Sequence, residues 1–344
     1  MTKKKESESN KYVGAGRKGN DERRTQNDER FFSSAFIVLR SSFPFRPYSV
    51  IVVALLMLAL LLGASCNRGV ERAAAPRADK PARIVSLSPS ATEILYGVGA
   101  FGRVVAVSDY CTYPPEVKNL PRVGGWSNPN LEQIASLRPD LVVFADQQAQ
   151  FVKEKIEALG IRTLSVPSRT LEDALKAIEL TGEATHEVDA ARALAERTRA
   201  TIATVQTATE RAPRRRVLCV VDRVPGTLRD IYVAGEGTFI AQLIQVAGGE
   251  PVSPPAREGW GKLQKEAVIA FDPDIIIDLM MHKETGQFDE DTLAVWGELP
   301  TLRAVREKRV YAIRDESVLH PSQFVGDTAR KFAELIHPDA FAKK

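Results

Sequence analysis

An internal repeat restricts the fold of this chain of 344 residues more than any other feature of its sequence. The first copy, GWSNPNLEQIASLRPDLVV, covers residues 125–143, and the second, GWGKLQKEAVIAFDPDIII, covers residues 259–277. Both contain Gly-Trp, a Glu six residues after the Trp, and Pro-Asp seven residues after the Glu, at a constant offset of 134. The unbroken apolar run that follows each Pro-Asp is typical of a buried parallel strand. The repeat therefore predicts two copies of one α/β unit.

The segments around the repeat agree with an α/β fold, because short apolar strands alternate with amphipathic helices. The strand Ile84–Leu87 precedes a helix that ends in glycines, and the strand Val217–Val220 does the same. Within the first of these helices, Ser90-Ala91-Thr92-Glu93 has the pattern of a capping box.

Between the two copies, residues 188–205 are rich in strong helix formers and contain almost no turn residues. We expect one long helix that joins the two lobes and ends before Pro213. Because a helix is a stiff connection, this prediction implies limited motion of the lobes rather than wide hinge closure.

The sequence predicts an α/β protein of two similar lobes, joined by one long helix, with a ligand cleft between the lobes. Its segments are an N-terminal extension with a lipoprotein-type signal peptide (1–65), a flexible tether (66–82), an N-terminal α/β lobe (83–170), a linker with the long helix (171–212) and a C-terminal α/β lobe (213–344).

The N-terminal segment has the features of a targeting signal. Residues 50–64 carry no charge and follow Arg40 and Arg46, which suits the apolar region of a signal peptide. The small residues Gly63-Ala64-Ser65 stand directly before Cys66, and this arrangement resembles the lipobox of bacterial lipoproteins. The prediction is that Cys66 is lipidated; the alternative is an uncleaved anchor helix. Both place the remaining chain outside the cytoplasm, in the periplasm or cell envelope.

Charge and cysteine content narrow the function classes. Residues 66–344 hold 36 basic and 38 acidic side chains, and this balance argues against binding of nucleic acid. Cys111 and Cys219 are interpreted as two buried thiols, although a bridge between them stays open. The four histidines have no metal-ligand spacing, so we expect neither a metal nor a cofactor.

Four motifs carry a resemblance to a known family: RIVSLSPSATEIL (83–95), YCTYPPEV (110–117), VGGWSNPNLEQIASLRPDLVV (123–143) and the repeat over 259–274. They are similar to the helical-backbone substrate-binding proteins of type II ABC importers, which carry vitamin B12, haem and iron–siderophores. The resemblance implies two lobes with the ligand between them and a monomer that is not an enzyme. It also implies two partners, an ABC permease and its ATPase.

Within that family the chain is most similar to the members that bind vitamin B12. The resemblance implies that aromatic side chains from both lobes contact the ligand, at Tyr110, Trp126, Tyr232 and Trp260. A further family Trp falls near Ala145, where no ring is present. Rigid aromatic rings offer large contact area to a flat ligand at low entropic cost. The expected cargo is cobalamin or a related corrinoid.

The resemblance also implies that Glu132 and Glu266 dock onto arginines of the permease. Acidic residues are favoured in the first turn of any helix, which is the alternative explanation for both. Asn128-Pro129, just before Glu132, has the pattern of an N-cap and a first helical residue. The equivalent positions of the two glutamates in the repeat favour docking.

Three other interpretations remain at this stage. In the first, the ligand is a ferric siderophore or haem, and cleft arginines would be needed; the candidates are Arg122, Arg169 and Arg257. In the second, the chain is an envelope enzyme on a two-lobed scaffold, which would require a pair of titrating groups in the cleft. In the third, it is a purely structural envelope lipoprotein with a filled cleft.

Overall fold

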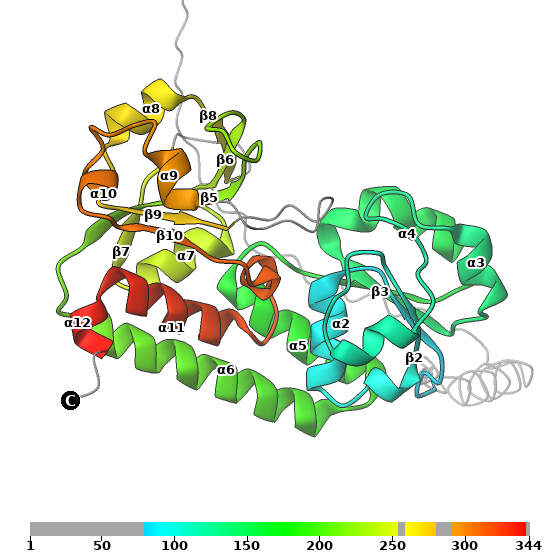
Figure 1. Cartoon of the computed structure of the whole chain (residues 1–344). Coiled ribbons are helices and arrows are strands. Elements are labelled where there is room, and N and C mark those ends of the chain that lie inside the picture. Colours follow the sequence, from blue (N-terminus) through cyan, green and yellow to red (C-terminus); the bar gives the residue numbers. More distant parts are fainter. Residues whose placement is uncertain (1–78, 254–258, 280–290, 342–344) are drawn as a thin grey trace, which may run out of the picture. The chain divides into compact units, whose positions relative to one another are not determined.

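The computed structural model describes residues 79–253, 259–279 and 291–341. They form two α/β lobes that are connected by two helices (Figure 1). The elements of the N-terminal lobe are β1 (Ile84–Ser86), α2 (Pro89–Gly97), β2 (Val104–Val107), α3 (Leu131–Ser136), β3 (Leu141–Ala145), α4 (Ala149–Glu157) and β4 (Thr163–Val166). Its four strands form a parallel sheet in the order β2-β1-β3-β4.

The C-terminal lobe contains a second sheet with the same parallel centre. Its elements are β5 (Arg215–Asp222), β6 (Ile231–Ala234), α7 (Phe239–Val246), β7 (Gly249–Pro251), β8 (Trp260–Leu263), α8 (Lys265–Phe271), β9 (Ile275–Asp278), α9 (Thr292–Trp296), α10 (Arg303–Arg306), β10 (Val310–Ala312), α11 (Val325–Ile336) and α12 (Pro338–Phe341). The order is β10-β9-β5-β6-β8, with β7 also paired to β5. Strands β10, β9 and β7 run parallel to their neighbours, whereas β6 and β8 are antiparallel additions.

The two lobes repeat one order of elements, as the sequence predicts. In the first lobe β1, α2, β2, α3 and β3 follow one another; in the second, β5, α7, β7, α8 and β9 do so, with β6 and β8 inserted. The central strands β3 and β9 are fully buried, which explains their unbroken apolar runs. The predicted two-lobed α/β class is confirmed.

The repeated Asp has the same structural role in each lobe. The Asp140 carboxylate accepts the backbone N–H of Arg83 at 3.0 Å, and its own N–H donates to the carbonyl of Arg83 at 3.0 Å. Asp274 makes the same two contacts with Arg216, both at 2.9 Å. Burial acts to raise the pKa of Asp274, but the bonds from Arg216 and Arg303 outweigh it and hold that pKa below its usual range. The Asp thus fixes the central strand against its neighbour.

Two helices connect the lobes, where the sequence predicted a single long one. The predicted helix is α6 (Val188–Thr209), and residues before it form a second helix, α5 (Leu171–Thr185). The two meet at Gly182, where an added Cβ would lie 2.2 Å from the Cβ of Ala191. Only glycine allows this approach.

Both connecting helices contribute to the cores of both lobes. In α6, Leu194 packs into the core of the N-terminal lobe and Val205 into that of the C-terminal lobe. In α5, Ile178 belongs to the first core and Ala174 to the second. The connection is therefore a packed layer rather than a free linker.

Two predicted helix starts are wrong by two residues. The N-cap of α2 is Ser88, whose side chain accepts from the N–H of Ala91, so the expected capping box at residues 90–93 does not form. The N-cap of α3 is Asn130 rather than Asn128, and it accepts from the N–H of Gln133. In both cases a second capping-type residue stands two positions away, and local pattern alone does not choose between them.

The thiol prediction is confirmed, because Cys111 and Cys219 are free and buried. Burial raises the pKa of each thiol above its ordinary value. Among the helices of the described residues, none is long and apolar enough to cross a membrane. The predicted signal peptide and Cys66 lie outside the described residues, so their assignment stays a prediction.

Candidate functional site

The aromatic candidates of the N-terminal lobe lie at the carboxyl edge of its parallel sheet. Tyr110 follows the end of β2, and Trp126 lies in the loop before α3. The two loops are joined by a hydrogen bond of 3.0 Å from the N–H of Asp109 to the carbonyl of Gly124. An added Cβ on Gly125 would lie 3.7 Å from the Tyr110 ring, so the two candidates are close neighbours. In open α/β sheets this edge is where ligands bind.

Hydrogen bonds from Arg122 hold the loop that carries Tyr110. The Nη1 of Arg122 donates to the carbonyls of Ser108, at 2.9 Å, and Cys111, at 2.6 Å. The Sγ of Cys111 lies 3.1 Å from the hydroxyl of Thr92. Tyr110 itself is 43% exposed at the surface above these contacts. Arg122, a sequence candidate for an anionic ligand, thus has a structural role in this loop.

A residue that the sequence did not single out, Gln148, holds the loop of Trp126. Its fully buried amide donates from Nε2 to the carbonyls of Leu87 and Trp126, both at 3.0 Å. Its Oε1 accepts the N–H of Ala145 at 3.1 Å. One side chain therefore connects the ends of β1 and β3 to the Trp126 loop. Because Gln147 and Gln150 stand beside it, nothing in the sequence marks Gln148 for this role.

The candidates of the C-terminal lobe share one face of the antiparallel strand pair β6–β8. Tyr232 pairs with Lys262, and Ala234 pairs with Trp260. Because paired residues and residues two apart lie on the same face of a sheet, Tyr232 and Trp260 both belong to that face. Their exposed fractions are 43% and 38%. We call Tyr232, Trp260 and Lys262 the β6–β8 face.

The approach to Trp260 requires a glycine. Gly259 has φ +76°, and an added Cβ would lie 2.8 Å from the Thr238 side chain and 2.9 Å from the carbonyl of Glu236. Its carbonyl accepts the N–H of Gly235 at 2.6 Å. In the first copy of the repeat the positive φ belongs to Gly124, one residue earlier than the Gly of Gly-Trp.

On the β6–β8 face, the charge of Lys262 is balanced by a neighbouring acid. The Nζ of Lys262 lies 5.7 Å from the centre of the Tyr232 ring and 2.5 Å from the carboxylate of Asp230. The hydrogen bond to Asp230 raises the pKa of Lys262. The cation is thus held between a ring and an acid, which leaves the face aromatic and polar without net charge.

A groove of about 550 Å³ is lined by both lobes. We call it the inter-lobe groove. Its N-terminal wall includes Thr112 and Tyr113, from the loop that carries Tyr110. Its C-terminal wall consists of residues 314–317, which follow β10, together with Phe324 and three residues of α11. The carboxyl edge of the first sheet and the segment after the last strand of the second therefore border one space.

The two docking candidates occupy equivalent, exposed positions. Glu132 is the second residue of α3, and Glu266 is the second residue of α8. Each helix directly precedes the central strand of its lobe. The structure confirms their structural equivalence, and their role in docking stays a prediction.

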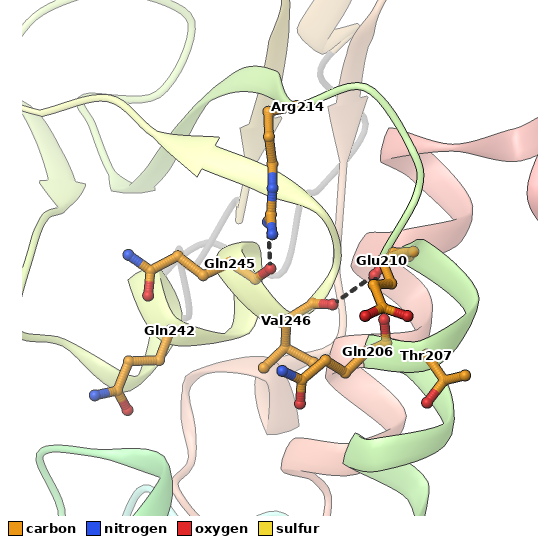
Figure 2. A pocket seen from close by; sticks show the side chains of 8 residues that line it. Gln206, Thr207, Glu210, Arg214, Gln242, Gln245 and Val246 are labelled. Atoms are coloured by element: carbon orange, nitrogen blue, oxygen red, sulfur yellow. Dashed lines mark hydrogen bonds between the residues drawn. The ribbon is translucent and has the colours of Figure 1, made fainter.

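Another cavity, of about 440 Å³, lies where the last turn of α6 meets α7 (Figure 2). Figure 2 shows the Arg214 side chain directed at the carbonyl of Gln245, to which its Nη1 donates at 2.9 Å. Thr209 donates to the carbonyl of Val246 at 2.9 Å. These polar groups serve the packing of the two helices, and none of the aromatic candidates lines this cavity.

Comparison with known proteins identifies the family. A family model described as periplasmic binding protein matches residues 84–317. The chain belongs to the periplasmic binding protein family. The resemblance drawn from the sequence motifs is confirmed at this level, and the two-lobed fold is the one that structures of such binding proteins share.

Three relatives indicate the range within the family. An uncharacterised ABC transporter substrate-binding lipoprotein of Bacillus subtilis is 30% identical, over 76% of this chain and 82% of its own length. A vitamin B12-binding protein of Pectobacterium atrosepticum is 27% identical, over 57% of this binding protein and 71% of its own length. The solved structure of a periplasmic haem-binding protein of Roseiflexus sp. RS-1 is 28% identical, with a TM-score of 0.65, over 75% of this chain and 98% of that one.

The role of Gln148 in this binding protein can be tested by Gln148→Ala. The change leaves buried carbonyls and an N–H without their partner, and each unsatisfied group costs about 1–3 kcal/mol. Because three groups lose their partner, we expect the free energy of unfolding to fall by about 3 kcal/mol or more. Amide exchange should accelerate over residues 123–130. Denaturant unfolding and hydrogen-exchange mass spectrometry measure both.

Its neighbour Gln147 provides the control, because its side chain is exposed and its Nε2 donates to the hydroxyl of Ser168 at 3.4 Å. Gln147→Ala should leave both quantities near those of the wild type. Unchanged exchange over residues 123–130 in Gln148→Ala would show that the loop is held by other contacts.

Proposed function

We propose that this chain is the substrate-binding protein of an ABC importer and that it captures cobalamin or a related corrinoid for delivery to the permease. The observation that carries the proposal is the placement of solvent-accessible aromatic side chains on both lobes. The exposed Tyr110 and the half-buried Trp126 lie on neighbouring loops at the carboxyl edge of one sheet. The β6–β8 face presents the exposed Tyr232 and Trp260 from the other lobe. The names of the Bacillus and Pectobacterium relatives agree with this proposal.

The charges near these rings support a ligand without net negative charge. A corrinoid such as cobalamin is flat and rimmed with amides, so it needs aromatic contact and hydrogen bonds rather than cations. Lys262 is paired with Asp230, and Arg122 donates inward to backbone carbonyls. Both cations are therefore already engaged in the ligand-free protein.

A haem or ferric siderophore is the second candidate ligand. It is favoured by the exposed Arg169, in the loop after β4, which could meet a carboxylate. The name of the Roseiflexus relative, a periplasmic haem-binding protein, agrees with this candidate. Arg257, the third arginine considered, lies outside the described residues.

Binding in this proposal involves no covalent step, and the ATPase of the importer provides the energy for transport. The protein would be held at the cell envelope by a lipid on Cys66 and would act as a monomer. The lipoprotein name of the Bacillus relative supports the anchor.

The ligand proposal is tested by titrating the full chain, purified in detergent, with cyanocobalamin, haem and ferric siderophores. Calorimetry and Trp fluorescence report the Kd and stoichiometry. We expect one cyanocobalamin per chain and a Kd at least about tenfold weaker in Trp126→Ala and in Trp260→Ala, because truncation of a buried ring commonly costs about 2 kcal/mol or more.

Each outcome of the titration has a separate meaning. Binding of haem or a siderophore in place of cyanocobalamin would reject the corrinoid and retain the binding protein. Cyanocobalamin binding that both Trp variants leave unchanged would reject the aromatic site. Phe151→Ala, at an exposed ring on α4, is the matched control and should leave the Kd within twofold.

We further propose that Glu132 and Glu266 orient the protein on its permease. Both acids are exposed at equivalent helix starts, and complementary charges guide an encounter more than they add affinity. In cells whose only copy of the protein is Glu132→Arg/Glu266→Arg, uptake of radiolabelled cyanocobalamin should fall about tenfold or more. The Kd of the purified variant should stay within twofold of the wild type. Uptake at the wild-type rate would contradict the docking role.

A further inference from the structure

Glu93 joins the two lobes through an unusually complete set of contacts. It lies in α2 of the N-terminal lobe and is 2% exposed. Its Oε1 lies 2.6 Å from the Nδ1 of His320, and its Oε2 accepts the hydroxyl of Ser322 at 2.5 Å. Its backbone carbonyl accepts the Nε2 of Gln323 at 2.9 Å. All three partners belong to the C-terminal lobe.

Both carboxylate oxygens of Glu93 are engaged by the other lobe. Oε1 lies within hydrogen-bond distance of the His320 imidazole, and Oε2 accepts the Ser322 hydroxyl. Hydrogen bonds weaken steeply when their distance and angle depart from the preferred geometry. A tilt of one lobe would therefore leave a buried carboxyl group with incomplete partners.

Close packing surrounds the carboxylate. The rings of Tyr113 and Phe324 meet across the lobes at 5.1 Å, edge to face. An added Cβ on Gly97 would lie 3.2 Å from the amide of Gln323, so α2 approaches the other lobe closely. The edge-to-face ring contact and the directional hydrogen bonds of Glu93 therefore act at the same point between the lobes.

The same residues border the inter-lobe groove. Glu93, Tyr113 and Phe324 line it, and Tyr113 belongs to the loop that carries Tyr110. The two walls of the groove are also joined by a hydrogen bond of 3.3 Å from the hydroxyl of Thr112 to the carboxylate of Glu316. The position of the segment Glu316–Phe324 on α2 therefore sets how far apart the two walls of the groove stand.

We propose that Glu93 is a positioning residue that fixes the distance between Tyr110 and Trp126 on one lobe and the β6–β8 face on the other. It acts through His320 and Ser322 and does not touch the ligand. The consequence for affinity rests on the proposed function, but the distance itself exists without ligand. A cleft of fixed width binds a rigid flat molecule at a low cost in ordering.

The test measures the distance between the lobes in the full chain in detergent. Nitroxide labels are attached to Lys153→Cys in α4 and Ala270→Cys in α8, both exposed positions, and double electron–electron resonance records the distance distribution. The native Cys111 and Cys219 are buried, and a chain without the introduced cysteines accounts for any labelled native thiol.

Glu93→Ala should broaden or displace the distance distribution in the absence of ligand. Glu93→Gln should restore most of the wild-type distribution, because its amide keeps one acceptor and offers a donor to the imidazole. Asp140→Ala is the matched control: it removes a carboxylate that contacts only its own lobe. It should lower the Tm but keep the distribution narrow.

A wild-type distribution in Glu93→Ala would overturn the proposal. If Glu93→Ala does not fold, Ser322→Ala removes a single bond, and it should broaden the distribution to a smaller extent; a narrow one would overturn the proposal equally. The affinity for whichever ligand the titration identifies should fall about tenfold in Glu93→Ala. A broadened distribution with unchanged affinity would reject the effect on binding but leave the proposed ligand untouched.

Discussion

The structure depends on a layer of helices that belongs to both hydrophobic cores. Because α5 and α6 each bury side chains in the N-terminal and in the C-terminal core, the lobes cannot separate without exposing apolar surface to water. The close approach at Gly182 makes the two helices one unit. The contacts of Glu93 add direction to this connection at a point closer to the groove.

In the proposed function, two loops of one lobe and the strand pair β6–β8 of the other form one binding surface, and this helix layer is its rigid base. The aromatic residues of each lobe are held in place by a few polar bonds or by a constrained glycine. Gln148 and Arg122 hold the loops of Trp126 and Tyr110, while Gly259 allows the chain to turn into Trp260. The fixed lobes then set the spacing between the two aromatic groups.

The fold was largely predictable from the sequence because its repeat is also a physical repeat. The Asp of each Pro-Asp makes the same pair of bonds to an Arg backbone, so its spacing from the preceding strand is constrained. The apolar runs after it are the buried strands β3 and β9. The sequence does not separate α5 from α6 clearly, because the C-cap of α5 is His186, which takes the left-handed conformation that glycine usually provides.

Residues whose partners lie far away in sequence were not predictable in the same way. Glu93 fits a capping box locally, but its carboxylate bonds to residues 227 and 229 positions further on. Gln148 connects three chain segments that only the folded sheet brings together. Composition and spacing alone do not single out the four aromatic candidates, because exposure and orientation follow from tertiary structure. Only the family resemblance points to them.

In the proposed function, one ligand is held between aromatic side chains of both lobes. The decisive measurement is a crystal structure of the protein grown with cyanocobalamin. It should show one corrin ring between Tyr110 and Trp126 on one side and Tyr232 and Trp260 on the other. A corrinoid bound to one lobe alone, or bound away from these four rings, would contradict it.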